Sequence, residues 1–192
     1  MAREDPQIVA GIRAGDPDVL GDIVGRYLRQ IERAARGAGL DAHQAEEVAQ
    51  ATFVTFIETA PRFEGRSTVR TWIFGILYRK LQEARRGFAK DRKMDDIDEV
   101  FESRFDERGH WSTPPASPDA AVDSEEAMAE IEGCLEETPA RQRLAFVLRE
   151  VEELSTEEIC NVLEITRTNL GVMLFRARNR LRECLEAKGR LE

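Results

Sequence analysis

Apolar residues recur along most of the chain at the three- and four-residue spacing of amphipathic helices, and no segment shows the convincing alternation of a β-strand. The pattern fails over residues 89–123, where prolines and clustered acidic residues stand instead. The pattern predicts helices over 6–14, 17–38, 41–58 and 68–88, one that begins near 124, and then 138–153, 155–163 and one from 166.

Several predicted helices begin with residues that can satisfy the free N–H groups of a first helical turn. Asp41 is followed three residues later by Gln44, and Ser155 by Glu158, which is the spacing of a capping box. Thr166 stands where it can cap the last helix. These local signals support the boundaries that the apolar pattern predicts.

The interruption of the pattern predicts an all-α protein of two small helical domains, 1–90 and 124–192, joined by a flexible acidic linker at 91–123. The helix over 138–153 is expected to be continuous and capped by Thr138-Pro139.

The net charge of −9 hides an uneven distribution of charge along the chain. Residues 61–93 hold ten Lys/Arg and three Asp/Glu, a net of +7, and residues 166–190 hold seven and two, a net of +5. Residues 94–140 hold two and fifteen, a net of −13. Two separate basic surfaces indicate binding to nucleic acid, although charged patches are also ordinary on helical surfaces.

Residues 154–184 contain two predicted helices joined by a short turn at 163–165. The second helix carries an arginine ladder, Arg176, Arg178, Arg180 and Arg182. Because alternate positions on a helix diverge by about 200°, some of these arginines must point to solvent. The arrangement is typical of a helix-turn-helix that reads duplex DNA; a helical hairpin with a basic solvated face is the alternative.

The loop at 61–68 and the helix after it combine cations with aromatic rings, in the order Arg62, Phe63, Arg66, Arg70 and Trp72. Cations that follow phosphates, beside rings that stack on unpaired bases, make a surface for single-stranded nucleic acid. Two structural alternatives stay open, in which Trp72 anchors the core and Phe63 plugs the loop.

No constellation of residues indicates catalysis, a cofactor or a metal ion. Cys134, Cys160 and Cys184 are widely spaced and form no CxxC motif, which predicts structural or incidental thiols and argues against a disulfide framework or a zinc site. The chain opens without a signal pattern and has no apolar run that could cross a bilayer, so we expect a cytoplasmic protein.

Three blocks of the sequence, at 45–86, 138–163 and 166–184, resemble the sigma-70 family of bacterial RNA polymerase initiation factors and stand in that family's order. The chain looks most like the small two-domain extracytoplasmic-function (ECF) group. The resemblance implies a protein without enzymatic activity that binds core RNA polymerase and recognises the −10 and −35 elements of promoters.

The resemblance also implies roles for individual residues. The helix at 41–58 would pack against the clamp helices of the largest polymerase subunit, with contacts from Gln50, Phe53 and Val54. A flipped base of the melted −10 element would be captured by Arg62, Phe63, Arg66, Thr68, Arg70 and Trp72. The last helix would enter the −35 major groove, and the family's DNA-facing positions are matched by Arg167, Thr168, Asn169, Gly171, Val172, Phe175 and Arg176.

The acidic linker would thread the RNA-exit path of the polymerase, and an anti-sigma protein would hold the factor inactive, as is common in the ECF group. The sequence departs from the family at Glu164, where a small residue is common, and at Gly171 and Met173, where basic residues are common. Base reading would therefore rest more on Arg167 and Asn169 and on apolar contacts. The arginine ladder would supply phosphate affinity more than sequence choice.

A stand-alone helix-turn-helix regulator that binds duplex DNA as a dimer is the first rival hypothesis. It would leave the block at 45–86 unexplained. An enzyme that uses the acidic residues is a more distant third.

Overall fold

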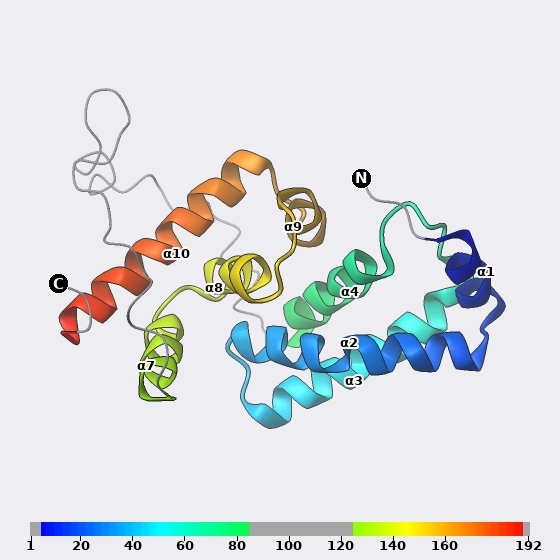
Figure 1. Ribbon diagram of the computed structural model, residues 1–192, viewed down its shortest axis with the longest axis horizontal. Coiled ribbons are helices and arrows are strands. Elements are labelled where there is room, and N and C mark those ends of the chain that lie inside the picture. The colour runs from blue at the N-terminus through cyan, green and yellow to red at the C-terminus, as the bar shows by residue number, and fades with distance from the viewer. Residues whose placement is uncertain (1–4, 85–124, 190–192) are drawn as a thin grey trace.

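The protein is described by a computed structural model over residues 5–84 and 125–189, and every regular element in these two ranges is a helix. The N-terminal domain contains α1 (Pro6–Ala14), α2 (Pro17–Gly37), α3 (Ala42–Thr59), the 3₁₀ turn η1 (Ala60–Arg62) and α4 (Val69–Ala84). The C-terminal domain contains α7 (Glu125–Glu136), α8 (Ala140–Phe146), η2 (Val147–Val151), α9 (Thr156–Leu163) and α10 (Arg167–Ala187). Figure 1 shows these two groups at opposite ends of the long axis.

In the N-terminal domain the long helix α2 packs against α3, and α3 packs against α4. Ile31 of α2, Phe56 of α3 and Leu77 of α4 are all fully buried, as the apolar pattern predicts. Burying each of these side chains contributes about 1.5–3 kcal/mol. The packing fixes the start of α4, and with it the predicted single-strand surface.

The helix starts in both domains use the predicted caps. Asp41 Oδ1 accepts a hydrogen bond from the Gln44 N–H at 2.8 Å, and the Asp41 N–H donates one to Gln44 Oε1 at 3.3 Å. Ser155 and Glu158 form the second capping box, and Thr166 Oγ1 accepts from the Asn169 N–H at 3.2 Å. The sequence-based starts of α3, α9 and α10 are therefore confirmed.

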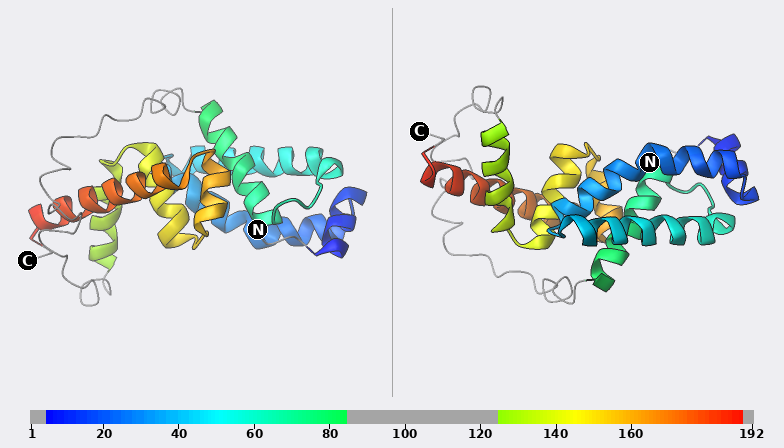
Figure 2. Two further views of the ribbon diagram at one scale, coloured as in Figure 1. Left: turned by 90° about the horizontal axis from the view of Figure 1, so that it is seen from above. Right: turned by 90° about the horizontal axis from the view of Figure 1, so that it is seen from below.

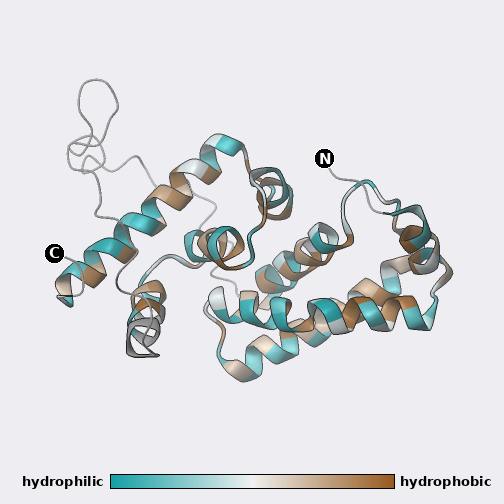
Figure 3. Ribbon diagram, in the orientation of Figure 1, coloured by the Kyte–Doolittle hydropathy of each residue, from teal (hydrophilic) through white to brown (hydrophobic). Residues whose placement is uncertain are grey.

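In the C-terminal domain the long helix α10 packs against α7, α8 and α9. Its buried face consists of Leu170, Met173, Leu174 and Ala177. Figure 3 shows hydrophobic and hydrophilic residues alternating along α10, which leaves a polar face on its other side.

The helix predicted over 138–153 is confirmed over 140–151, but it is not an α-helix throughout. The α-helix α8 ends at Phe146, and the next turn, η2, is a π-helical turn in which the Glu152 N–H donates to the Val147 carbonyl at 2.9 Å. The capping residue is Pro139, whose side chain cannot accept a hydrogen bond, so the predicted cap by Thr138 is also wrong. A π turn holds one more residue than an α turn, and a 3.6-residue pattern cannot predict it.

The prediction of thiols without a disulfide is wrong for two of the three cysteines. Cys134 of α7 and Cys184 of α10 form a disulfide with a Cα–Cα distance of 5.7 Å, and Cys160 is free. The two cysteines are 50 positions apart in the sequence, which gave no sign of their proximity. Proximity arises because α7 packs against α10.

The two domains pack against each other. In Figures 1 and 2, α4 lies beside α9, and the C-terminal end of α2 approaches α8 and η2. One cluster of buried apolar side chains runs through both domains. The linker predicted at 91–123 and the end of the helix predicted to reach residue 88 lie outside the described residues, so their predictions stay untested.

Candidate nucleic-acid interface

The loop between η1 and α4 carries two of the predicted single-strand contacts on its surface. Arg62 and Arg66 are exposed, and Arg66 Nε lies 2.8 Å from the carboxylate of Glu64. The loop turns at Gly65, which has a φ of +67°, and a Cβ atom there would lie 2.9 Å from a methyl carbon of Val9. The loop is therefore held closely against α1.

The two aromatic candidates lie on top of each other. The Phe63 and Trp72 rings stack with centroids 4.5 Å apart, and Phe56 meets Trp72 edge-on at 5.2 Å. Phe63 is buried and Trp72 is half-buried. In this arrangement both rings pack within the domain, and of the two only Trp72 offers an appreciable part of its ring to a base.

Thr68 and Arg70 lie at the start of α4 and face the C-terminal domain. Thr68 Oγ1 accepts a hydrogen bond from the Thr71 N–H at 3.1 Å, in the manner of a helix cap. Arg70 Nη2 donates to the backbone carbonyl of Glu152 and lies 4.0 Å from the Glu152 carboxylate. A residue expected to touch DNA is thus held by the other domain.

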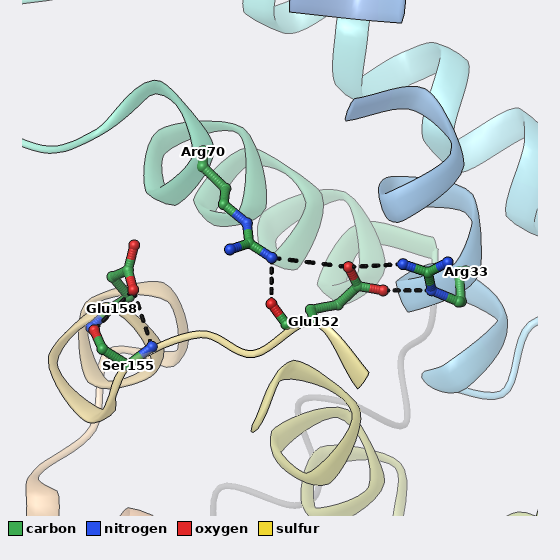
Figure 4. Close-up of polar contacts among 5 residues, drawn as sticks. All are labelled: Arg33, Arg70, Glu152, Ser155 and Glu158. Carbon is green, nitrogen blue, oxygen red and sulfur yellow. Dashed lines mark hydrogen bonds and ion pairs between the residues drawn. The ribbon is translucent and has the colours of Figure 1, made fainter. Parts of the chain in front are cut away.

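The Glu152 carboxylate also binds Arg33 of α2 (Figure 4). Arg33 Nε and Nη2 donate to its two oxygens at 2.7 and 3.1 Å, which is a bidentate pair. The Glu152 side chain is 1% exposed, whereas that of Arg33 is 53% exposed. The hydrogen bond to Glu152 raises the pKa of Arg33 by more than burial lowers it.

A second polar contact joins α4 to α9. The Thr71 hydroxyl donates to Glu158 at 3.1 Å, and the Glu158 carboxylate also accepts from the Ser155 N–H at 2.9 Å. Burial raises the pKa of Glu158, but the hydrogen bonds from Ser155 and Thr71, with the charge of Arg70, lower it to a net value below the usual range. Thr71, Ser155 and Glu158 line part of an open cleft of about 270 Å³ between the domains.

The helices α9 and α10 form the predicted helix-turn-helix. Glu164 ends α9 in the left-handed conformation, at φ 54° and ψ 49°, and the next N–H, of Ile165, donates to the Cys160 carbonyl at 3.1 Å. Arg79 of α4 lies 3.7 Å from the exposed Glu164 carboxylate. The left-handed conformation of this turn is strained for a residue other than glycine.

The predicted duplex contacts lie together on the first three turns of α10, beside the turn and away from its buried face. The exposed members are Arg167, Thr168 and Gly171, and the half-buried ones are Asn169, Val172, Phe175 and Arg176. A recognition helix contacts bases with residues near its N-terminus. The exposed residues of α10 also lie near its N-terminus.

Three residues of the arginine ladder bind carboxylate or amide groups of their own domain. Arg178 lies 2.5 Å from Glu150, and Arg180 donates to the side chain of Gln142 at 2.6 Å. Arg182 forms an ion pair with Glu186 one turn further along α10, at 3.2 Å. Sequence reasoning missed the first two partners because they lie in η2 and α8 and share no local spacing with α10.

The predicted polymerase contacts on α3 differ in exposure. Gln50 is exposed and Val54 is 55% exposed, whereas Phe53 is 5% exposed and packs in the core. The apolar surface continues to Ile57, which is 46% exposed and which sequence reasoning did not select. Ile57 stands three residues after Val54 and therefore on the same face of the helix, and this spacing could have predicted it as a contact.

Within residues 5–84 and 125–189 there is no group of three His, Cys, Asp or Glu side chains that could hold a metal ion. In the same ranges no helix combines the length and the apolar character that a membrane crossing requires.

Two family regions match this chain. Residues 23–90 match Sigma-70 region 2, and residues 128–181 match Sigma-70, region 4. A probable RNA polymerase sigma factor of Haemophilus influenzae is 36% identical over 156 residues, which cover 77% of this chain and 79% of the relative. The RNA polymerase sigma-H factor of Pseudomonas aeruginosa is 28% identical over 184 residues, 95% of this chain and 94% of the relative.

The ECF RNA polymerase sigma factor SigD of Mycobacterium tuberculosis is 29% identical over 190 residues, 95% of this chain and 84% of the relative. Among solved structures, CnrH in complex with the cytosolic domain of CnrY has a TM-score of 0.66 at 20% identity, covering 94% of this chain and 96% of that one. The sigma factor RpoE in complex with the anti-sigma factor NepR, from Bartonella quintana, has a TM-score of 0.63 at 21% identity, covering 86% and 96%.

The fold and the matched regions define a two-domain helical subunit of the transcription machinery. The chain belongs to the sigma-70 family of RNA polymerase sigma factors, in its ECF group. This family is not enzymatic, in agreement with the sequence-based expectation.

Proposed function

We propose that this sigma factor recognises promoters at two points, with the start of α4 and the loop before it on the −10 element and with the N-terminal turns of α10 on the −35 element. The observation that carries the proposal is the order of the two family regions, at 23–90 and 128–181, in one chain. A stand-alone helix-turn-helix regulator would need only the second region.

For the −35 element, the proposal places the start of α10 in the major groove. Arg167 is exposed there and can form a bidentate pair with guanine, while Asn169 can pair with adenine. Glycine at 171 leaves open space around it, since a Cβ atom there would meet nothing within 4 Å. That space admits the close approach of a DNA backbone or base edge.

For the −10 element, Arg62 and Arg66 have the exposure that phosphate contacts require. Trp72 is the accessible member of the aromatic pair and is the residue we assign to base stacking. Phe63 acts beneath it and holds the Trp72 ring in position. Arg70 joins this surface once the C-terminal domain releases it.

The polymerase contact is assigned to Gln50, Val54 and Ile57 on the exposed face of α3, opposite the clamp helices of the largest subunit. Phe53 supports this face from the core. Apolar side chains on a solvent-facing helix are typical of a surface that a partner covers.

Three further properties follow from the proposal. Residues 91–123, which are rich in acidic residues, pass through the RNA-exit path of the polymerase. An anti-sigma protein holds the free factor inactive, which is supported by the anti-sigma complex of the similar RpoE. The chain works in the cytoplasm, where core polymerase works.

The proposal is tested by transcription from a promoter library with bacterial core polymerase. We expect promoter-directed transcripts only when this chain and the core enzyme are both present. Arg167→Ala should lower the transcript from the selected promoters by roughly tenfold, since one specific base contact contributes about 1–3 kcal/mol. The proposal would be wrong if the chain bound an operator tightly without polymerase and gave no promoter-directed transcript when polymerase was present.

The polymerase assignment has its own variant. Val54→Asp places a charge on the exposed apolar face of α3 and should abolish co-purification with core polymerase. Glu58→Gln, also exposed on α3, is the matched control and should leave co-purification unchanged. Equal binding by both variants would exclude this face of α3.

A further inference from the structure

Helix α1 packs closely on two parts of the N-terminal domain, each time at a glycine. A Cβ atom at Gly11 of α1 would lie 2.8 Å from Cγ2 of Val19 in α2, and one at Gly65 would lie 2.9 Å from Cγ2 of Val9 in α1. Both distances are shorter than the optimal separation of two carbon atoms. Figure 1 shows α1 at the end of the molecule remote from the C-terminal domain. Helix α1 therefore lies between α2 and the loop that carries Gly65.

Hydrogen bonds and burial fix the position of α1. Asp5 Oδ1 accepts from the Gln7 N–H at 2.7 Å at the start of the helix, and the Gly15 N–H donates to the Ile12 carbonyl at 3.0 Å at its end. Ile12 is fully buried. A helix of nine residues is not stable alone in water. The caps and the packing on α2 therefore make α1 a fixed support for the loop.

The loop before α4 has two inward contacts. Phe63 is buried and its ring stacks on Trp72, and Gly65 lies against α1. Glu64 and Arg66, on either side of Gly65, are exposed. A contact that fixes Gly65 thus also fixes where its charged neighbours point and limits the movement of the Phe63 ring.

Glycine at 65 is required for two reasons. Its φ of +67° is a conformation that residues with a side chain rarely adopt, and Val9 leaves no room for a Cβ atom. The loop is therefore held in one conformation before any base is bound. Ordering a loop on binding costs conformational entropy, so a loop that is already in place binds a base more tightly.

We propose that Val9 is a positioning residue for the −10 element, which holds the turn at Gly65 and so keeps Phe63 and Trp72 in place for base capture. The inference rests on the proposed function for the role of Trp72 in base stacking. Val9 acts through the loop. The sequence-based set of −10 contacts contains no residue of α1, because no local spacing relates Val9 to Gly65.

The first test compares two valine substitutions in promoter opening by the chain with core polymerase, on a promoter selected from the library. Val9→Ala removes the methyl groups that meet the loop and should slow opening by roughly two- to tenfold, the effect of having to order one loop side chain on binding. Formation of the closed complex should be unchanged. Val24→Ala is the matched control, because Val24 is also half-buried and packs against the same apolar cluster from α2. It should open the promoter at the wild-type rate, and so should Val9→Ile, which keeps the Cγ2 methyl group.

The second test reports the position of the loop without DNA. The chain has two tryptophans, and Trp111→Phe leaves Trp72 as the only one. In that background Val9→Ala should shift the Trp72 emission to longer wavelength and raise its quenching by acrylamide, because a looser Phe63 uncovers the ring. Gly65→Ala, which disturbs the same contact from the loop side, should give the same shift. Val24→Ala should leave emission and quenching unchanged.

The inference is wrong if Val9→Ala and Val24→Ala have the same Trp72 emission. It also fails if Val9→Ala changes the emission but opens the promoter as fast as Val24→Ala, because α1 would then support the loop without serving base capture. Absence of any promoter-directed transcript from the wild type would instead count against the proposed function. The Trp72 emission would still decide whether Val9 holds the loop.

Discussion

At the scale of residues, two glutamates of the C-terminal domain differ in how they are held. Glu152 is buried and bound by side chains of the other domain. Glu158 is half-buried and belongs first to its own helix start, where it completes a capping box with Ser155. Glu158 also accepts a hydrogen bond from Thr71 of the other domain. Glu158 therefore contributes to the stability of α9 as well as to the junction.

The lowered pKa of Glu158 predicts a dependence of stability on pH. A carboxyl group whose pKa is lower in the folded state stabilises the protein above its ordinary pKa, about 4.3. This contribution is lost as the pH falls through the lowered pKa. Glu158→Gln can keep the capping box but removes the charge, and should thus reduce the free energy of unfolding at pH 6 by about 0.3–1 kcal/mol, as expected for a negative charge in the first turn of a helix. It should reduce it much less at pH 3.

The measurement is urea unfolding of the wild type and Glu158→Gln at both pH values. Glu157→Gln is the control, because Glu157 is the exposed neighbour in the same turn and lies outside the capping box. A loss of equal size at the two pH values would show that the charge of Glu158 is not what stabilises the helix start.

The caps show what the sequence could predict at this scale. Asp41, Ser155 and Thr166 bind N–H groups three residues away, so the spacing alone predicts their contacts. The bond between Arg70 and Glu152 joins residues 82 positions apart. No local rule predicts it, and the sequence therefore placed Arg70 on DNA without its competing partner.

At the scale of elements, α10 has three surfaces. One face is buried in its domain, the N-terminal turns are exposed beside the turn at Glu164, and the second half is tied to its own domain by arginines. The sequence predicted the first two because they follow from helical periodicity. The sequence assigned the whole arginine ladder to phosphates. The partners of these arginines lie in α8 and η2, and no local pattern relates those segments to α10.

This division of α10 predicts how binding to the −35 duplex depends on salt. Each phosphate neutralised by a cation steepens the slope of log K against log salt by about 0.9. Arg167 is assigned to a base, but it also brings a positive charge into the groove, so Arg167→Ala should make the slope shallower by up to about 0.9. Arg178→Ala and Arg180→Ala should leave it nearly unchanged, because these side chains bind Glu150 and Gln142.

The slope is measured by fluorescence anisotropy of a labelled duplex selected from the promoter library, with each variant titrated at several salt concentrations. Circular dichroism checks that α10 stays folded. A slope that falls by the same amount for Arg178→Ala as for Arg167→Ala would mean that the ladder leaves its internal partners and follows the DNA backbone.

The π turn η2 is the element that the sequence could not predict. The apolar residues at 144, 147, 148 and 151 fit a helical period, so the pattern does not reveal the extra residue of the π turn. That residue changes only the positions of the groups that follow it. Its consequence is spatial, because it sets Val147 against Gly37 and Glu152 against Arg33. A π turn placed at a functional junction is a frequent occurrence in proteins.

At the scale of the whole molecule, the two domains share one buried apolar cluster and the charged contacts of Glu152 with Arg33 and Arg70. The sequence predicted both domains from the loss of periodicity between them, but contact between two amphipathic domains leaves no periodic signal. Shared burial makes the unfolding of one domain costly for the other. The free chain should therefore unfold as a single cooperative unit.

The disulfide provides a way to test this coupling, because it lies wholly within the C-terminal domain. Closing a loop of 50 residues stabilises a domain by about 4 kcal/mol on the chain-entropy estimate. The double variant Cys134→Ser/Cys184→Ser should therefore destabilise that domain directly. In scanning calorimetry we expect a single transition at a lower temperature, because the N-terminal domain loses the surface that supports it.

Two further variants separate coupling from simple loss of stability. Cys160→Ser removes the free thiol and should leave the transition temperature nearly unchanged, since it breaks no cross-link. Adding Gly37→Ala to the double serine variant should split the single transition in two, because the opened domains no longer share their buried contact. Two transitions in the disulfide variant alone, with the upper one at the wild-type temperature, would show domains that fold independently. The junction would then be too weak to hold Arg70 away from DNA.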